Sequence, residues 1–478
     1  MPNTYKIFML LWLLILTCGC RKTHEPLGSY RDQNPAEPKY RAVVLVQFKD
    51  KGASISQLAK PQEFLSEEAI SRRRAQGISI NNQDLPIDPQ YIASCVKVTH
   101  GKVLHVSKWL NYLVLHLPED SDTASLEELA FVQEVNKLGE FKNYRHPLFP
   151  EQNQENSELS DVNLDTLTFS RDNYKDTYNL FQRHNAGVFP EKKLFGKNKK
   201  IALIDLGFAF INDKPEIAHL IKDQKISGSY DFLMNSNNVN AGTSRGNYNL
   251  GIMAAINPGK YMGTAPAASY VLLIADAVGV QEPLFETAWV AALEYADSCG
   301  VDIVSSYSNF GAAFDNPIYQ INSEHTDGRA RCSQAADIAF EKGMLVIQSL
   351  NSGGGSSRKI VVPPADAKHI LSVGNLRENG SAVWSSIDTH TADGRIKPEL
   401  GSLVENVPVI YGWGGSWSNA HASAIIAGFT ACLWEGLPHK TVQEIREILL
   451  KSSHNYEHPD TKLGYGITNF EKALLENL

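Results

Sequence analysis

The sequence has no long hydrophobic run beyond its first 20 residues. Its most apolar stretch, Ile7–Leu16, follows Lys6 and is too short to cross a bilayer as a helix. A basic residue followed by a short apolar run is typical of the core of a signal peptide. We therefore expect an exported protein without a membrane-spanning helix.

Cysteine is also scarce, with 6 residues in 478, and two of them follow the apolar run directly. The segment Thr17-Cys18-Gly19-Cys20 places a small residue before a cysteine, which is similar to the lipobox of bacterial lipoproteins, although Thr17 stands where lipoboxes carry Leu. This resemblance implies that Cys20 is lipidated. The alternative is an ordinary secretory signal in which Cys18 and Cys20 have no role. We expect residues 1–20 to be a lipoprotein signal, residues 21–39 a tether, and the protein to be lipid-anchored to a bacterial membrane in the cell envelope.

The other four cysteines have none of the spacings of a metal site. They are Cys95, Cys299, Cys332 and Cys432. Cys299 and Cys432 lie in apolar, helical surroundings, so we expect buried thiols there rather than disulfides. No metal or other cofactor is expected.

An excess of positive charge is absent too. The net charge is -8 and the pI is about 6.0, which excludes nucleic acid as the main partner. Hydrophobic residues make up 43% of the chain, an ordinary globular composition that allows two or three domains.

The segment 40–145 is predicted to form a small α+β domain. We expect strands at 40–48, 102–106, 110–117 and 132–138 and helices at 61–76, 89–98 and 121–130. Arg72–Arg74 could form a basic binding patch, but three charges alone favour a solvated helix face. Residues 146–198, which begin with an acidic, polar stretch, are expected to form a linker.

The segment 199–478 alternates continuous apolar strands with helices. Such alternation predicts an α/β fold with a mostly parallel sheet that helices cover on both faces. We expect strands at 200–206, 269–275, 303–306, 344–348 and 370–374 and helices at 285–299, 331–342, 422–435 and 441–452.

Several motifs in this segment follow one another in the order found in subtilases. They are IALIDLGF (201–208), PGKYMGTAPAASYVLL (258–273), PPADAKHILSVG (363–374), ADGRIKPEL (392–400), IIAGFTACLW (425–434) and LGYGITNF (463–470). The segment therefore resembles the subtilisin-like serine protease family. Residues 40–145 resemble the N-terminal domain of exported bacterial subtilases, notably in EFLSEEAISRRR (63–74).

The resemblance implies a catalytic triad of Asp, His and Ser in that chain order. The Asp falls on Asp205 at the end of an apolar strand. The His-Gly-Thr motif falls on Arg245-Gly246-Asn247, so Arg245 stands at the His position. Because arginine stays protonated, it cannot act as a general base. Asp205 and Arg245 are hypothesised to form a pair.

The triad Ser falls on Ala420, counting back without gaps from Ala427-Gly428. Alanine has no nucleophilic atom. A second register makes Ser416 the nucleophile, with an insertion before Ile425. A full helical turn inserted there would displace the nucleophile from its base.

Two further positions depart from the family pattern. Ser352 stands where subtilases carry the Asn that donates to the oxyanion. Tyr307-Ser308-Asn309 stands where they carry Ser-Leu-Gly beside the substrate, which adds side-chain bulk there.

We favour a catalytically inactive pseudoprotease that acts as a lipid-anchored binding or scaffold module for a peptide or protein ligand. The alternative is an active serine endopeptidase that uses Ser416. A metal-dependent hydrolase at Asp205 lacks a supporting cluster of His, Asp and Glu.

Overall fold

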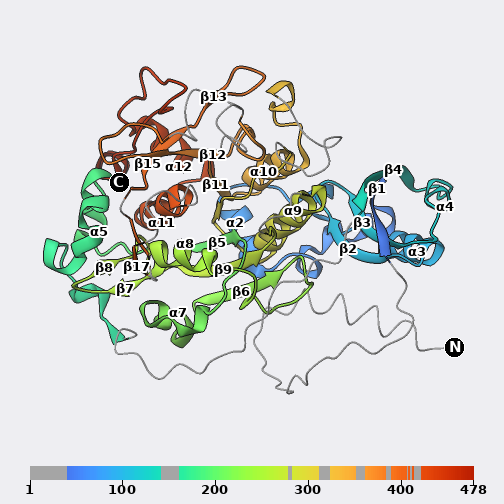
Figure 1. Ribbon diagram of the computed structural model, residues 1–478, viewed down its shortest axis with the longest axis horizontal. Coiled ribbons are helices and arrows are strands. Elements are labelled where there is room, and N and C mark those ends of the chain that lie inside the picture. The colour runs from blue at the N-terminus through green and yellow to red at the C-terminus, as the bar shows by residue number, and fades with distance from the viewer. Residues whose placement is uncertain are drawn as a thin grey trace. The chain divides into compact units, whose positions relative to one another are not determined.

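The computed structural model describes residues 40–140, 161–277, 282–311, 323–350, 361–383, 389–405, 407–409, 412–413 and 421–478. The chain divides into two compact units. The smaller one contains residues up to 70 and residues 80–143, and the larger one contains residues 71–79 and 144–478. Figure 1 shows the elements of both.

The smaller unit contains a four-stranded antiparallel sheet in the order β2-β3-β1-β4. Its strands are β1 (Tyr40–Phe48), β2 (Lys102–Ser107), β3 (Tyr112–Pro118) and β4 (Val132–Glu140), and its helices include α3 (Pro89–Thr99) and α4 (Ala124–Glu127). Val44, Val46 and Phe48 alternate along β1 and enter the core of this unit, as the period of two in a strand requires. Asp88 caps α3 by accepting a hydrogen bond from the Gln90 amide.

The larger unit contains a seven-stranded sheet in the order β15-β12-β11-β10-β5-β9-β6, and every neighbouring pair is parallel. Its strands are β5 (Lys200–Asp205), β6 (Ile226–Asp231), β9 (Ser269–Ile274), β10 (Ile303–Ser306), β11 (Leu345–Ser349), β12 (Leu371–Leu376) and β15 (Leu400–Leu403). Two-stranded pairs add β7 (Ile256–Asn257) with β8 (Tyr261–Met262), β13 (Thr389–His390) with β14 (Ile396–Lys397), and β16 (Pro408–Val409) with β17 (Gly412–Trp413).

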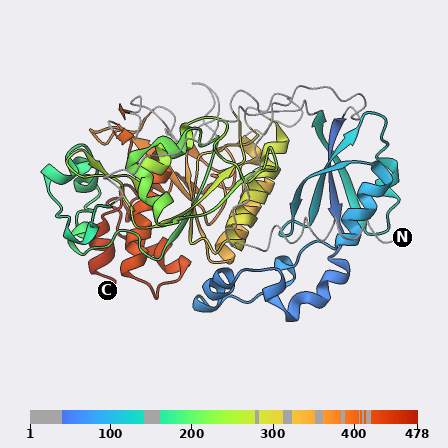
Figure 2. The ribbon, with the colours of Figure 1, turned by 90° about the horizontal axis from the view of Figure 1, so that it is seen from below.

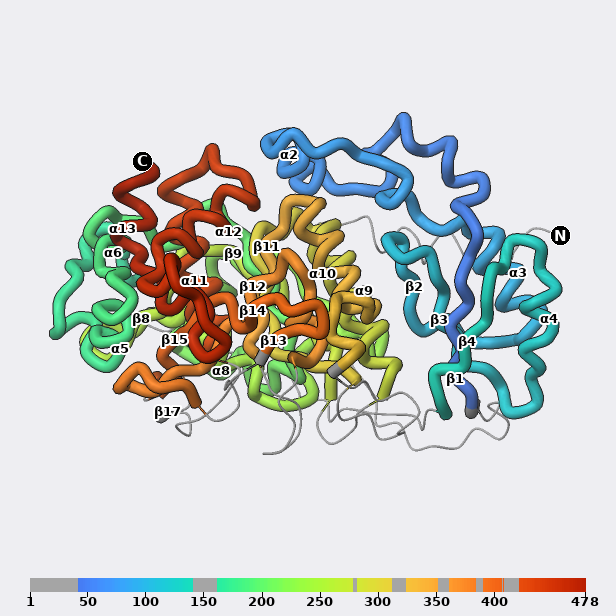
Figure 3. The backbone as a smooth tube through the Cα atoms, turned by 90° about the horizontal axis from the view of Figure 1, so that it is seen from above, coloured from blue at the N-terminus to red at the C-terminus, as the bar shows by residue number. Residues whose placement is uncertain are grey.

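Helices cover both faces of this parallel sheet. They are α5 (Arg171–Arg183), α6 (Val188–Glu191), α7 (Ala218–Lys222), α8 (Arg245–Ala254), α9 (Pro283–Ser298), α10 (Arg331–Glu341), α11 (His421–Gly436), α12 (Val442–Lys451) and α13 (Phe470–Leu475). Figures 2 and 3 show α8 and α11 on one side of the strands and α9 and α10 on the other. The predicted α/β fold class, a parallel sheet with helices on both faces and a small N-terminal α+β domain, is confirmed.

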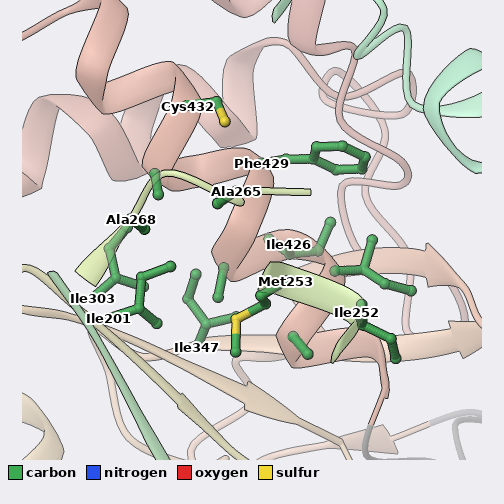
Figure 4. Packing of buried hydrophobic residues seen from close by; sticks show 14 of the residues in the cluster. Ile201, Ile252, Met253, Ala265, Ala268, Ile303, Ile347, Ile426, Phe429 and Cys432 are labelled. Carbon is green, nitrogen blue, oxygen red and sulfur yellow. The ribbon is translucent and has the colours of Figure 1, made fainter. Parts of the chain in front are cut away.

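The helix α11 lies at the centre of the main hydrophobic core. Its residues from His421 to Trp434 are all buried, which explains why its sequence is apolar around the whole helix. Ile426 and Phe429 belong to one buried hydrophobic cluster with Ile201 and Ile347 from the sheet (Figure 4). Gly428 faces Thr264, so α11 approaches the loop before β9 closely.

The predicted linker over 146–198 differs from the structure in its second half. Helices α5 and α6 lie there, and Tyr174, Phe181 and Phe189 are buried in the main core. These aromatic side chains belong to the larger unit, which therefore begins before residue 199. The four cysteines after Cys20 are all buried with free thiols, at Cys95, Cys299, Cys332 and Cys432.

The prediction that Arg72–Arg74 form a solvated helix face is wrong for two of the three residues. Arg72 and Arg73 lie on α2 (Glu67–Ala75), are 6% and 1% exposed, and form ion pairs with Asp297. Arg74 alone is exposed. The sequence could not show this, because the partner carboxylate lies more than 200 residues away in the chain.

Candidate functional site: a buried carboxylate facing an arginine

Asp205 ends β5 at the carboxyl edge of the parallel sheet, where active sites of α/β proteins gather. It is only 2% exposed. The Leu206 amide donates to its Oδ1 at 2.8 Å, and the Asn249 side-chain amide donates to its Oδ2 at 2.7 Å. A buried carboxylate needs such donors to be stable.

Arg245 is the first residue of α8, and it lies beside Asp205. Its Nε is 3.9 Å from Asp205 Oδ1, and its side chain is 23% exposed. The guanidinium carbon lies 3.5 Å from the centre of the Tyr307 ring, so the cation stacks on an aromatic face. Gly246 follows it, and a Cβ there would lie 2.6 Å from the Gly207 carbonyl oxygen. The motif glycine is therefore required for α8 to start this close to the strand.

Asn249 joins Asp205 to a histidine that sequence reasoning did not single out. Its Oδ1 lies 3.0 Å from Nδ1 of His421, the first residue of α11. Because the Asn249 nitrogen donates to Asp205, its oxygen accepts, and His421 donates from Nδ1. Burial, followed by the positive charge of Arg245, lowers the pKa of His421 to about 4. His421 is therefore a neutral imidazole at neutral pH.

A second carboxylate, Asp276, follows β9 at the same edge of the sheet. Burial raises its pKa to about 6, against hydrogen bonds from the Ala277 amide and Ser308 and the charge of Arg245. Arg245 thus lies in the field of two buried carboxylates. No signal in the sequence singled out Asp276, because an Asp at or after the end of a strand is common in α/β folds.

The Tyr307-Ser308-Asn309 segment after β10 is held by one hydrogen bond from β11 and one within the segment. The Gln348 side chain donates to the Ser308 carbonyl at 2.9 Å, and the Asn309 side chain donates to the Tyr307 carbonyl at 2.7 Å. Tyr307 thereby presents its ring to Arg245. This replaces the small, open segment expected beside a subtilase substrate.

Three predicted site residues, Ser352, Ser416 and Ala420, lie outside the described residues. The described part of α11 begins at the next position, His421. Ser423, in its first turn, has its hydroxyl 3.0 Å from that of Ser349 and 3.2 Å from that of Ser305. These three hydroxyl groups are buried among one another and join α11 to β10 and β11.

Two signals in the sequence could have led to the missed residues. Asn249 is four positions after Arg245 on one helix, so the two side chains share a face. His421 stands directly after the position assigned to the nucleophile.

In the described parts of the chain, no group of three or more His, Cys, Asp and Glu could hold a metal ion. Nor does any helix there have the length and apolar character needed to cross a membrane.

Known families match both parts of the chain. The peptidase S8 propeptide domain of Bacteroidota matches residues 43–157, and the subtilase family matches residues 196–466. Thermitase from Thermoactinomyces vulgaris is 26% identical over 200 residues, which make up 41% of this chain and 60% of thermitase. The chain thus matches less than two thirds of that relative's length.

Solved structures of other subtilisin-like proteins share the fold. Fervidolysin from Fervidobacterium pennivorans, a keratinolytic enzyme related to subtilisin, has a TM-score of 0.53 at 17% identity, covering 93% of this chain and 62% of fervidolysin. The epidermin leader peptide processing serine protease from Staphylococcus aureus has a TM-score of 0.55 at 13% identity, covering 91% of this chain and 100% of that one. With both family models matched in chain order, the protein belongs to the subtilase family of serine peptidases and carries the propeptide domain of the Bacteroidota members.

Proposed function

We propose that this subtilase is a catalytically inactive pseudoprotease that acts as a lipid-anchored binding or scaffold module for a peptide or protein ligand. The observation that carries the proposal is the contact between Arg245 and Asp205, with 3.9 Å between Nε and Oδ1. A triad needs an imidazole on this carboxylate that can accept a proton. Arginine cannot accept one, so the proton of a serine nucleophile would have no acceptor at this position.

His421 does not supply the missing base. Its Nδ1 donates to the neutral Asn249 amide and not to a carboxylate, so this contact does not stabilise an imidazolium as the triad Asp would. The pKa of about 4 makes it a weak proton acceptor at neutral pH, whereas a general base works best with a pKa near the working pH. Loss of the triad His or Ser costs roughly a million-fold in the rate of subtilisin itself.

A binding role is consistent with the hydrogen-bonded side chains that occupy the position of the subtilase active site. Asp205, Asn249 and His421 are buried and joined by hydrogen bonds, and Arg245 stacks on Tyr307. Because the Arg245 side chain is partly exposed, a ligand can contact its positively charged group, which Asp205 and Tyr307 hold in position. We also propose that acyl chains on Cys20 anchor the protein and that its ligand is a peptide or a protein. The acidic net charge argues against nucleic acid as the ligand.

Hydrolysis of a mixed peptide library by the purified full-length chain tests the proposal, with Ser416→Ala and His421→Ala as matched variants. We expect the wild type to cleave no faster than either variant. Cleavage by the wild type that disappears in both variants would show an active endopeptidase built on Ser416 and His421. Ala420→Ser alone should restore no cleavage, because no base would activate the new hydroxyl.

A further inference from the structure

The guanidinium of Arg245 has hydrogen-bond donors that face outward. Its ion pair with Asp205 spans 3.9 Å between Nε and Oδ1, which is longer than a hydrogen bond. In the parts of the chain that the structure describes, no oxygen accepts a hydrogen bond from this guanidinium. Because the side chain is partly exposed, its planar fork of N–H groups can donate to an acceptor that comes from a ligand.

This guanidinium is held in place before any ligand arrives. Its central carbon lies 3.5 Å from the centre of the Tyr307 ring. The Tyr307 carbonyl accepts from the Asn309 side chain at 2.7 Å, and the Ser308 carbonyl accepts from Gln348 at 2.9 Å, so the segment that carries the ring is itself fixed. A fixed guanidinium loses little conformational freedom on binding. Its parallel N–H groups match the two oxygens of a carboxylate.

Two buried carboxylates near Arg245 determine how a further anion can bind. Asp205 accepts from the Leu206 amide and from the Asn249 side chain, so groups other than Arg245 also stabilise its charge. Asp276 differs, because burial raises its pKa to about 6. A negative charge placed nearby raises that pKa further, and Asp276 then takes up a proton. An incoming carboxylate thus replaces the charge of Asp276 instead of adding to it.

We propose that Arg245, on the face of Tyr307, binds a carboxylate of the peptide or protein ligand, which is either the C-terminus of the ligand or the side chain of an Asp or Glu. This inference rests on the proposed function, since it names the ligand group that the site recognises. A neutral backbone carbonyl offers one acceptor oxygen and no charge. A carboxylate offers two oxygens and a charge, and therefore makes the stronger contact with a guanidinium.

The test uses a mixed library of short peptides in two forms, one with a free C-terminal carboxylate and one with a C-terminal amide. Each form is passed over the immobilised full-length chain, and the retained peptides are identified by mass spectrometry. Preferential retention of the free acids would assign the carboxylate to the C-terminus. Equal retention of both forms, with enrichment of Asp and Glu, would assign it to a side chain. Either result supports the proposal.

Substitutions of Arg245 show whether the retained peptides bind at this guanidinium. Arg245→Gln should weaken their binding by about tenfold or more, because charge-assisted hydrogen bonds are lost. Arg171→Gln on α5 is the matched control and should leave binding unchanged, since Arg171 is an exposed arginine that also lies over a tyrosine ring, that of Tyr178. Arg245→Lys is a second variant in case Arg245→Gln does not fold. It keeps the charge but loses the planar fork, and we expect binding weaker by about threefold or more.

Uptake of a proton by Asp276 makes this binding depend on pH. The charged and titratable groups around Asp276 are Asp205, Arg245 and, next to Arg245, His421. His421 has a pKa of about 4 and is neutral at pH 5.5 as well as at pH 7.5. We expect the retained peptides to bind about fivefold more tightly at pH 5.5, where Asp276 is largely protonated, than at pH 7.5. Asp276→Asn should remove that difference.

The inference and the proposed function fail in different ways. Retention of neutral peptides as strongly as peptides with a carboxylate would overturn the inference and leave the binding role intact, whereas retention of no peptide would contradict both. Unchanged binding in Arg245→Gln, or in its replacement Arg245→Lys, would also overturn the inference. So would equal affinity at pH 5.5 and pH 7.5, because the bound carboxylate would then lie outside the field of Asp276.

Discussion

Asn249 bridges two buried polar groups, the carboxylate of Asp205 and the imidazole of His421. We predict that Asn249→Leu, which keeps the branched shape and removes both hydrogen bonds, lowers the free energy of unfolding by about 2–4 kcal/mol. The loss arises because the carboxylate and the ring nitrogen stay buried without these partners. Urea unfolding of the purified chain measures it.

Asn237→Leu is the matched control for this substitution, because Asn237 is exposed. A change there should stay within about 0.5 kcal/mol. If both variants lost the same stability, the hydrogen-bonded bridge through Asn249 would contribute nothing of its own.

The buried neutral His421 gives the protein a pH-dependent stability. Its pKa falls from 6.5 to about 4 on folding, so the unfolded chain binds the proton more tightly and stability is lost as pH falls from about 6.5 toward 4. Between pH 7.5 and pH 5 this amounts to about 2 kcal/mol for one such group. We predict that His421→Gln reduces the pH dependence of the unfolding free energy by about that amount.

Other groups also titrate between pH 7.5 and pH 5. Because the wild type and His421→Gln both contain them, their contributions to the unfolding free energy cancel when the two are compared. His184 and His219 have pKa values lowered by burial to about 3 and about 4, so they act in the same direction as His421. Asp276 acts in the opposite direction, because its contribution is lost as pH rises through about 6. Equal pH dependence in the wild type and His421→Gln would contradict a neutral buried imidazole at this position.

The sequence could predict a contact between distant residues only where a family pattern fixes both positions. Asp205 and Arg245 were predicted as neighbours because a family pattern fixes both positions. Asn249 and His421 form their hydrogen bond across 172 positions of the chain, and no spacing in one sequence specifies such a pair. Arg72 and Arg73 were misjudged for the same reason, since their partner Asp297 follows only from tertiary structure.

Helices with strong local signals were predicted to within a few residues. The fully apolar α11, expected at 422–435, spans His421–Gly436, and α12, expected at 441–452, spans Val442–Lys451 with a capping box of Thr441 and Glu444. Strand β6 was missed because its sequence, ISGSYD, is polar and only partly buried. Packing at the edge of the sheet makes it a strand despite weak propensity.

The close approach of α11 to the loop before β9 depends on Gly428. A Cβ there would lie 1.8 Å from Thr264 Oγ1 and 2.8 Å from its Cβ, so Gly428→Ala forces the helix or the loop to move. We predict a loss of about 2–4 kcal/mol in the free energy of unfolding. Gly228→Ala on β6 is the control, because its new Cβ would meet atoms no closer than 3.5 Å. An equal effect of both substitutions would contradict close packing as the cause.

For the molecule as a whole, the membrane attachment rests on one predicted feature, the lipidated Cys20. We predict that Cys20→Ser moves the protein from the membrane fraction to the soluble fraction of its host, because acyl chains would supply its membrane affinity. Fractionation followed by detection of the subtilase part measures this. A variant that is cleaved normally after its signal yet stays in the membrane fraction would contradict the lipid anchor.

Reaction with a fluorophosphonate, read out as the intact mass of the full-length chain, tests the absence of an activated serine most directly. Such a reagent phosphonylates a serine only where a base activates the hydroxyl, and Arg245 holds the place of that base beside Asp205. We predict an unchanged mass for the wild type and for Ala420→Ser. One adduct per wild-type chain, located on Ser416 and lost in Ser416→Ala, would contradict it.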